Sequence, residues 1–183
     1  MNIVITGAAG FIGFHLAKKL LQFKGNKILG IDSLNNYYST KLKKNRISIL
    51  KKKKNFFFSK NNLVKENIIK SIISDFKPEI IFHLAGQPGV LYSFKNPRSY
   101  YSNNIEATKS IVKIAKKLKV KKFIYASSSS VYGDQKHFPI KENFKLNPKN
   151  PYAITKIKSE LIIKKILKTN VQFMIFRFFT VYG

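Results

Sequence analysis

The first 32 residues contain the pattern that most restricts how this chain can fold. Residues 2–6 are a short apolar, β-branched run, as expected for a buried parallel strand. Glycines follow at positions 7, 10 and 13, and an apolar stripe at helical spacing begins at Phe11. A strand, a glycine turn and a helix in this order form the context that a dinucleotide-binding fingerprint requires.

Glycine permits the tight turn, the close approach of backbone to a pyrophosphate, and the close packing of helix on strand. The new helix also presents unpaired N–H groups and the positive end of its dipole to phosphates. We therefore expect this turn to contact the cofactor through Gly7, Gly10, Phe11, Ile12 and Gly13.

A second predicted strand, residues 26–31, ends at Asp32, which lies 19 residues after Gly13. A carboxylate at this point can bind the two hydroxyls of an adenosine ribose. The alternative is an ordinary strand with a solvated acid at its end. We favour NAD over NADP, because Asp32 would repel a 2′-phosphate and Ser33 supplies no compensating cation.

Length and composition narrow the class of protein. A chain of 183 residues with 44% hydrophobic residues suits one globular domain, residues 1–183. The absence of cysteine excludes disulfides and thiolate chemistry, and the 3 histidines show no ligand spacing, so we expect no metal site. The sequence has no basic apolar leader and no run of transmembrane length, which predicts a cytoplasmic protein without a membrane partner.

The net charge of +27 arises from 35 Lys+Arg against 8 Asp+Glu. It suggests nucleic-acid or anionic-membrane binding, or a codon bias that enriches Lys, Asn, Ile and Phe together. We favour the second interpretation, because specific recognition of bases and phosphates favours arginine, and only Arg46, Arg98 and Arg177 are present. We expect no specific nucleic-acid partner, only non-specific polyanion binding at low salt.

Alternating strand and helix patterns predict an α/β fold, a Rossmann-type doubly wound parallel sheet of about six strands. In the predicted helix 65–75, Ile68, Ile69, Ile72 and Ile73 form the expected buried stripe. The predicted strands cover residues 2–6, 26–31, 55–58, 79–83, 122–126 and 171–178, and other predicted helices begin near Phe11, cover 98–118 and begin near Pro151.

Tyr152 and Lys156 stand four residues apart on one face of a predicted helix. A lysine ammonium beside a phenol favours the phenolate, so the pair can act as a base near neutral pH. The serines at 127–130 end the fifth predicted strand and could orient a substrate hydroxyl toward the tyrosine. Their ordinary role is to make turns, which we expect of at least two of the four.

Together, these motifs resemble the extended short-chain dehydrogenase/reductases of the NAD-dependent epimerase/dehydratase family, which act on nucleotide sugars. Residues 32–38, 125–133 and 177–183 are most similar to those of UDP-glucuronate 4-epimerases. The resemblance spans the whole chain, but family members are longer, so it covers their N-terminal part and the C-terminal substrate domain is missing. It implies a UDP-sugar substrate and a homodimer formed through helices near 98–118 and 151–168.

The resemblance also implies site residues. The catalytic set would be Ser128, Tyr152 and Lys156. The cofactor, besides the glycine turn and the catalytic Tyr152 and Lys156, would contact Asp32, Asn35, Asn36, Asn62, Leu84, Ala85, Gly86 and Asn104. The sugar would lie near Ser128, Ser129 and Thr180.

The implied reaction is epimerisation through transient oxidation at carbon 4 of the sugar. Leu91 stands where uronate epimerases commonly have arginine, and Pro88 replaces a small residue, so the resemblance does not choose between UDP-glucuronate and UDP-glucose. Three alternatives remain: a nucleotide-sugar dehydratase or decarboxylase, a non-catalytic NAD-binding remnant or sensor, and a polyanion-binding protein. We expect the 183 residues alone to show little or no turnover.

Overall fold

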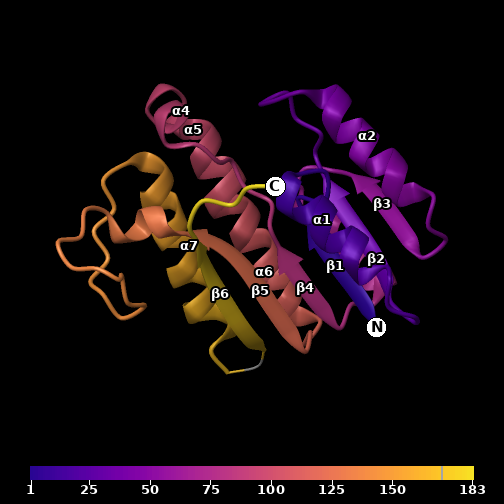
Figure 1. Cartoon of the computed structure of the whole chain (residues 1–183). Helices are drawn as coiled ribbons and strands as arrows, with labels where there is room; N and C mark the ends of the chain where they lie inside the picture. The colour runs from indigo at the N-terminus through magenta and orange to yellow at the C-terminus, as the bar shows by residue number, and fades with distance from the viewer. Residues whose placement is uncertain (170) are drawn as a thin grey trace.

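Six parallel strands form one twisted sheet in the order β3-β2-β1-β4-β5-β6 (Figure 1). The structure is a computed structural model that describes residues 1–169 and 171–183. This topology confirms the predicted Rossmann-type sheet. The strands are β1 (Asn2–Thr6), β2 (Lys27–Asp32), β3 (Phe56–Lys60), β4 (Ile80–His83), β5 (Lys122–Ser128) and β6 (Gln172–Phe178).

Helices cover the two faces of the sheet because strand residues alternate between them. Val4 packs with the layer formed by α3, α6 and α7, whereas Ile3 and Ile5 pack with the layer formed by α1 and α2. The helices are α1 (Phe11–Leu20), α2 (Thr40–Lys51), α3 (Glu66–Phe76), α4 (Val90–Lys95), α5 (Pro97–Tyr100), the π-helical η1 (Tyr101–Glu106), α6 (Ala107–Lys117), the 3-10 turn η2 (Ser129–Tyr132) and α7 (Pro151–Leu167).

The strand order reverses between β1 and β4, and both strands end at the same edge of the sheet. Ligands of open α/β sheets bind outside the carboxyl ends of the strands at such a point. After β6 the chain runs back along this edge, so that the C-terminus lies beside α1 (Figure 1). The fold therefore brings the first and last segments of the chain to one crevice.

Several local expectations need correction. Ser127 and Ser128 are the last residues of β5 rather than part of the following turn, because pairing with β6 extends the strand to Ser128. The helix expected at 98–118 is present as α5, η1 and α6, but its middle is π-helical. Ile68 is 47% exposed, so its place in the buried stripe was wrong, while Ile69 and Ile73 are buried. The buried face of helix α3 is therefore narrower than the predicted stripe of four isoleucines.

No helix in the described part of the chain is both long enough and apolar enough to span a bilayer.

Candidate active site

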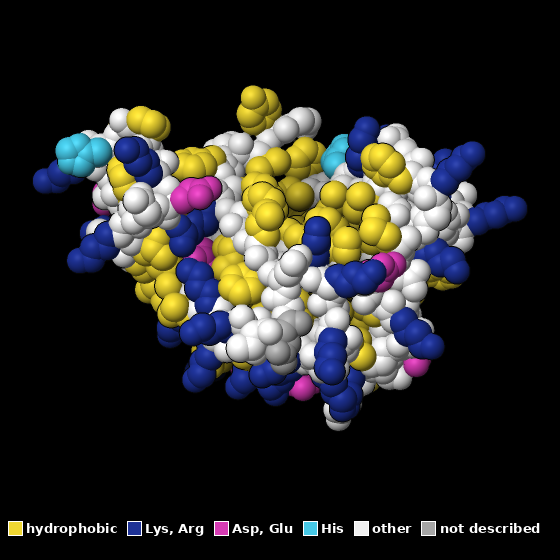
Figure 2. Space-filling model, turned by 90° about the horizontal axis from the view of Figure 1, so that it is seen from below, with side chains coloured by type: hydrophobic (Ala, Val, Ile, Leu, Met, Phe, Trp, Pro, Cys, Tyr) yellow, Lys and Arg dark blue, Asp and Glu magenta, His cyan; other side chains and the backbone are white. Residues whose placement is uncertain are grey.

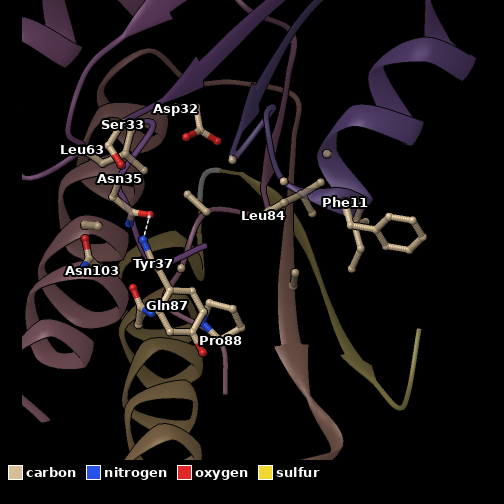
Figure 3. A pocket seen from close by; sticks show the side chains of 18 of the residues that line it. Phe11, Asp32, Ser33, Asn35, Tyr37, Leu63, Leu84, Gln87, Pro88 and Asn103 are labelled. Carbon is tan, nitrogen blue, oxygen red and sulfur yellow. Dashed lines mark hydrogen bonds between the residues drawn. The ribbon is translucent and has the colours of Figure 1, made fainter. Parts of the chain in front are cut away.

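A cavity of about 640 Å³ lies at the carboxyl edge of the sheet. Its walls come from the glycine turn, the loops after β2, β3 and β4, the end of β5, the start of α7 and the segment after β6. Figure 3 shows several of these side chains converging from separate elements. The predicted residues that line it are Gly7, Gly10, Phe11, Ile12, Gly13, Asp32, Asn35, Asn62, Leu84, Ala85, Gly86, Ser128, Tyr152 and Lys156.

The glycine turn is packed too tightly for side chains. Gly7 has a φ of +74°, and a Cβ there would lie 2.8 Å from the Ala85 amide nitrogen. A Cβ at Gly13 would strike the carbonyl oxygen of Gly7. The Gly7 contact holds the turn against the loop after β4, and the Gly13 contact closes the turn on the start of α1. Without side chains, this backbone allows the close approach of a pyrophosphate.

Asp32 builds this turn as well as lining the cavity. One carboxylate oxygen accepts a hydrogen bond from the Ala9 amide at 3.0 Å, and the other accepts from the Leu34 amide at 2.8 Å. Each oxygen still has acceptor capacity for a further hydroxyl. The carboxylate is therefore held rigidly, in a position from which it can bind two neighbouring hydroxyl groups.

Helix α2 brings two cations to the same end of the cavity, Lys43 and Arg46, which sequence reasoning did not include. Lys43 Nζ donates to the carbonyl oxygen and to Oδ1 of Asn35, at 2.7 and 2.6 Å. Arg46 donates to the Ala9 carbonyl oxygen at 3.2 Å and to the Tyr38 hydroxyl at 3.3 Å. Burial lowers the pKa of Lys43, and the Asp32 charge opposes that shift. The prediction of NAD over NADP considered only Ser33 as a source of compensating charge and did not include these two cations, both of which already have partners.

Tyr152, Lys156 and Ser128 meet at the other end of the cavity. Lys156 Nζ lies 5.8 Å from the centre of the Tyr152 ring, because both residues lie on the inner face of α7. Burial raises the pKa of the Tyr152 phenol, and a hydrogen bond from Ser128 opposes that rise. The three residues form a group that can hold and transfer a proton.

Lys156 is only 5% exposed, and its Nζ donates to the Ala126 carbonyl oxygen at 2.8 Å. Desolvation lowers its pKa to about 8, against the opposing charge of Glu160. A lysine with this pKa is charged in most molecules at neutral pH but can lose its proton readily.

Four predicted residues lie outside the cavity lining: Asn36, Asn104, Ser129 and Thr180. Asn104 is buried, and its side chain accepts from the Gln87 amide at 2.6 Å and donates to Thr155 Oγ1 at 2.9 Å. It therefore clamps the loop after β4 to α7. Asn36 and Thr180 are exposed, and Ser129 is half-buried.

Asn62 lines the cavity, but its side-chain oxygen already accepts from the Val64 amide at 3.1 Å. Tyr37 and Gln87 also line the cavity and were not predicted. Tyr37 reaches from the loop after β2 to the loop after β4, where its hydroxyl occupies the space that a side chain at Gly89 would need. Only the fold brings these loops together, so no sequence spacing could have identified the contact.

Among the residues that the structure describes, no group of three or more His, Asp or Glu side chains could hold a metal ion.

Comparisons with known proteins show the family and the fold. The model of the NAD dependent epimerase/dehydratase family matches residues 3–183. "Protein CapI" of Staphylococcus aureus is 42% identical over 186 residues, which cover 100% of this chain and 55% of that protein. "UDP-glucuronate 4-epimerase" of Thermodesulfobacterium geofontis is 36% identical over 182 residues, covering 98% and 56% respectively.

The solved structure of UDP-glucuronic acid 4-epimerase from Bacillus cereus, in complex with UDP-glucuronic acid and NAD, superposes with a TM-score of 0.93 at 34% identity. The match covers 100% of this chain and 58% of that one. The chain thus spans a little over half the length of the relatives it matches.

Proposed function

Because the chain belongs to the NAD-dependent epimerase/dehydratase family, we propose that residues 1–183 are the NAD-binding domain of a UDP-sugar 4-epimerase. The observation that carries the proposal is the shared cavity. One end has a bare glycine turn and a fixed Asp32 carboxylate, and the other end has Tyr152, Lys156 and Ser128.

The residues present fit NAD. The glycine turn at 7–13 would hold the pyrophosphate with the backbone N–H groups at the start of α1, because glycines let this turn pack without side chains against Ala85 and against itself. Asp32 would accept hydrogen bonds from the ribose hydroxyls of the adenosine, with Asn35 and Asn36 beside it and Asn62 near the adenine. Leu84, Ala85 and Gly86 would contact the remainder of the cofactor, and Asn104 would act by fixing their loop.

In the reaction, NAD supplies a reversible hydride acceptor for carbon 4 of the sugar. Burial alone raises the pKa of Tyr152, but the Lys156 ammonium and the positive nicotinamide ring of bound NAD would both favour the phenolate. That phenolate would take the proton of the 4-hydroxyl and return it after the sugar has presented its other face. Ser128 hydrogen-bonds the same hydroxyl and orients it. The Lys156 ammonium near the Tyr152 ring stabilises the phenolate and lowers the cost of the proton transfer.

The identity of the sugar rests on fewer contacts. Ser129 and Thr180 are the proposed neighbours of a uronate carboxylate. Leu91, at the position where an arginine is common, is 82% exposed on α4, whereas Pro88 lines the cavity. We propose UDP-glucuronate or UDP-glucose as the substrate, with dehydration or decarboxylation of the same sugars as the second candidate, because all these reactions share the oxidation at carbon 4.

We also propose a cytoplasmic homodimer formed through α6 and α7. Leu161 on α7 is 59% exposed and is available for such contact, while Ile105 is buried within the chain itself.

The test begins with cofactor binding. Asp32→Asn should weaken NAD binding by about 10- to 100-fold in calorimetry, because a charged hydrogen bond is worth roughly 1.5–3 kcal/mol. The exposed Asp75→Asn on α3 serves as the matched control and should bind as wild type. Wild-type protein that does not bind NAD would contradict the proposal.

Turnover is tested by incubating the protein with NAD and either UDP-glucuronate or UDP-glucose and following the 4-epimer by NMR. Tyr152→Phe should reduce any rate by roughly 10²–10⁴-fold, as expected for loss of a general base. Formation of a 4-keto product without the epimer would favour the dehydratase or decarboxylase alternative.

A further inference from the structure

A buried ion pair lies directly behind the proposed catalytic residues. Glu160 is 1% exposed, and its Oε1 accepts from Ser127 Oγ at 2.6 Å and from Arg177 Nε at 3.1 Å. Its Oε2 accepts from Arg177 Nη2 at 2.9 Å, which completes a bidentate pair. Pairs of this geometry are the strongest and most directional between side chains.

The pair connects the elements that carry the catalytic groups. Ser127 immediately precedes Ser128 in β5, and Glu160 follows Lys156 by one turn of α7. Arg177 comes from β6, and its Nη1 donates to the Tyr132 hydroxyl at 3.0 Å. The simplest role for the pair is structural, because it connects β6 to α7. The position of Glu160, one helical turn after Lys156, suggests that the pair also affects the charge of Lys156.

Residues four apart on a helix lie on the same face. Lys156 Nζ donates to the carbonyl oxygen of Ala126, and the Glu160 carboxylate accepts from the side chain of the next residue, Ser127, so both charged groups meet the end of β5. The Glu160 charge raises the pKa of Lys156 against the larger effect of burial. Apart from Arg177, the other titratable groups around Lys156 are uncharged near neutral pH in the ligand-free protein: His83 from β4 has a pKa of about 3, and burial raises the pKa values of the Tyr125 and Tyr152 phenols. Glu160 is thus the charge that favours the ammonium.

We propose that Glu160, balanced by Arg177, is a positioning residue that keeps the Lys156 side chain charged where the proton transfer takes place. The inference rests on the proposed function, because it gives that reaction a source for the positive charge beside Tyr152. Arg177 tempers the effect, since its guanidinium neutralises part of the Glu160 charge and holds the carboxylate in place.

The test measures Lys156 directly by NMR titration of lysine labelled with ¹³C at Cε, with its signal identified by its loss in Lys156→Met. Glu160→Gln should lower the pKa of Lys156 by about one unit, the typical effect of a close opposite charge. The charged fraction at pH 7.5 should then fall about threefold. Arg177→Met should raise the pKa of Lys156, because the Glu160 charge is no longer compensated.

The double variant Glu160→Gln/Arg177→Met should give a pKa of Lys156 between those of Glu160→Gln and wild type. It has no unpaired buried charge, so it remains informative if a single variant unfolds. Folded variants that lose thermal stability but keep the wild-type Lys156 titration would overturn the proposal and leave the pair with a structural role. NAD binding is measured in parallel as a separate test of the proposed function. A protein that does not bind NAD would contradict the proposed function, but it would leave the ranking of the Lys156 pKa values among wild type and variants unchanged.

Discussion

At the scale of single residues, Asp32 combines two tasks that are often separate. Its carboxylate fixes the glycine turn through Ala9 and the next loop through Leu34, and it also faces the cavity. Lys43 and Arg46 lie at the same end, but their donors are directed to Asn35, the Ala9 carbonyl and Tyr38. A 2′-phosphate would have to break these contacts as well as approach Asp32, so the preference for NAD over NADP stays a prediction.

His83 should make folding sensitive to acid. The ring is fully buried, with Nδ1 2.7 Å from Thr6 Oγ1 and Nε2 2.9 Å from Thr108 Oγ1, and burial lowers its pKa from 6.5 to about 3. The unfolded chain therefore binds this proton first as pH falls. The contribution of His83 is complete above pH 6.5 and is lost toward pH 3, at about 1.4 kcal/mol per pH unit.

Urea unfolding between pH 4 and 7 measures this slope. His83→Gln should reduce the slope by about one proton. His137→Gln, which removes an exposed histidine and keeps the buried ring, should retain the wild-type slope. Equal slopes in all three proteins would contradict the prediction.

Gln87 should limit the stability of the ligand-free protein. Its side-chain nitrogen is buried and has no hydrogen-bond partner among the described residues. An unsatisfied buried donor costs about 1–3 kcal/mol. Gln87→Leu should therefore raise the free energy of unfolding by about 1 kcal/mol.

The matched control is Gln135→Leu, because the Gln135 amide donates to the Tyr132 carbonyl oxygen at 2.6 Å and its loss should destabilise the protein. Chemical denaturation without ligand gives both values. A loss of stability in Gln87→Leu equal to that of Gln135→Leu would mean that the Gln87 amide is satisfied.

Residues with a local pattern could be predicted from the sequence. Tyr152 and Lys156 share a helical spacing, and the glycines at 7–13 follow a strand directly, so their meeting at one cavity required only the alternation of elements. Arg46, Tyr37 and Gln87 could not be found in this way. Their positions depend on loop paths and on contacts between segments distant in sequence, which spacing does not encode.

At the scale of elements, β6 is the least protected strand. In the part of the chain that the structure describes, it pairs with β5 alone and forms one edge of the sheet. Arg177 points toward α7, whereas Met174 and Phe176 lie on the opposite face and are 55% and 42% exposed. Exposed apolar side chains on an edge strand promote association.

We predict that Met174→Lys/Phe176→Lys reduces self-association at tens of micromolar in sedimentation velocity, a range in which micromolar affinities register. Phe57→Lys, at the other edge strand, is the control and should associate as wild type, because the Phe57 ring, although 47% exposed, packs edge-on against Phe76 of α3. If Leu161→Lys on α7 separates the subunits and the β6 variant does not, the proposed dimer of helices accounts for association instead.

The sequence predicted the presence of most strands and helices better than it predicted the residues at which they begin and end. The limits of each predicted strand agree with the observed strand within two residues. The inner strands are continuous apolar runs, and the edge strands β3 and β6 also contain runs of apolar residues although they are largely exposed. The limits of β5 depend on pairing with β6, which sequence does not specify locally. Helix α4 and the π-helical turn were missed because six-residue segments carry little periodic signal.

At the scale of the whole molecule, the positive charge has no single location. Figure 2 shows Lys and Arg side chains distributed over most of one face, with hydrophobic side chains grouped near its middle. Among the described residues only 3 ion pairs form, which leaves most of the 35 basic residues without an acidic partner. A dispersed field of this kind attracts polyanions without orienting them.

We predict that the protein binds duplex DNA of any sequence at 20 mM salt and loses at least ~10²-fold in affinity by 200 mM, as expected for counterion release. Fluorescence anisotropy with two unrelated duplexes measures this. Binding that persists at 200 mM salt, or that differs tenfold between the duplexes, would indicate a specific nucleic-acid site.

The π-helical turn between α5 and α6 has a consequence for how the length of this chain can vary. Its wider turn accommodates an extra residue relative to an α-helical path, and Asn104 lies within it. Deletion of one codon from 101–106 would allow a regular helix, but would rotate one flank by about 100° relative to the other. Asn104 would then lose its hold on the Gln87 backbone. Insertions and deletions should therefore accumulate in the loop at 133–150, while lineages that keep the Asn104 clamp should preserve the length of this turn.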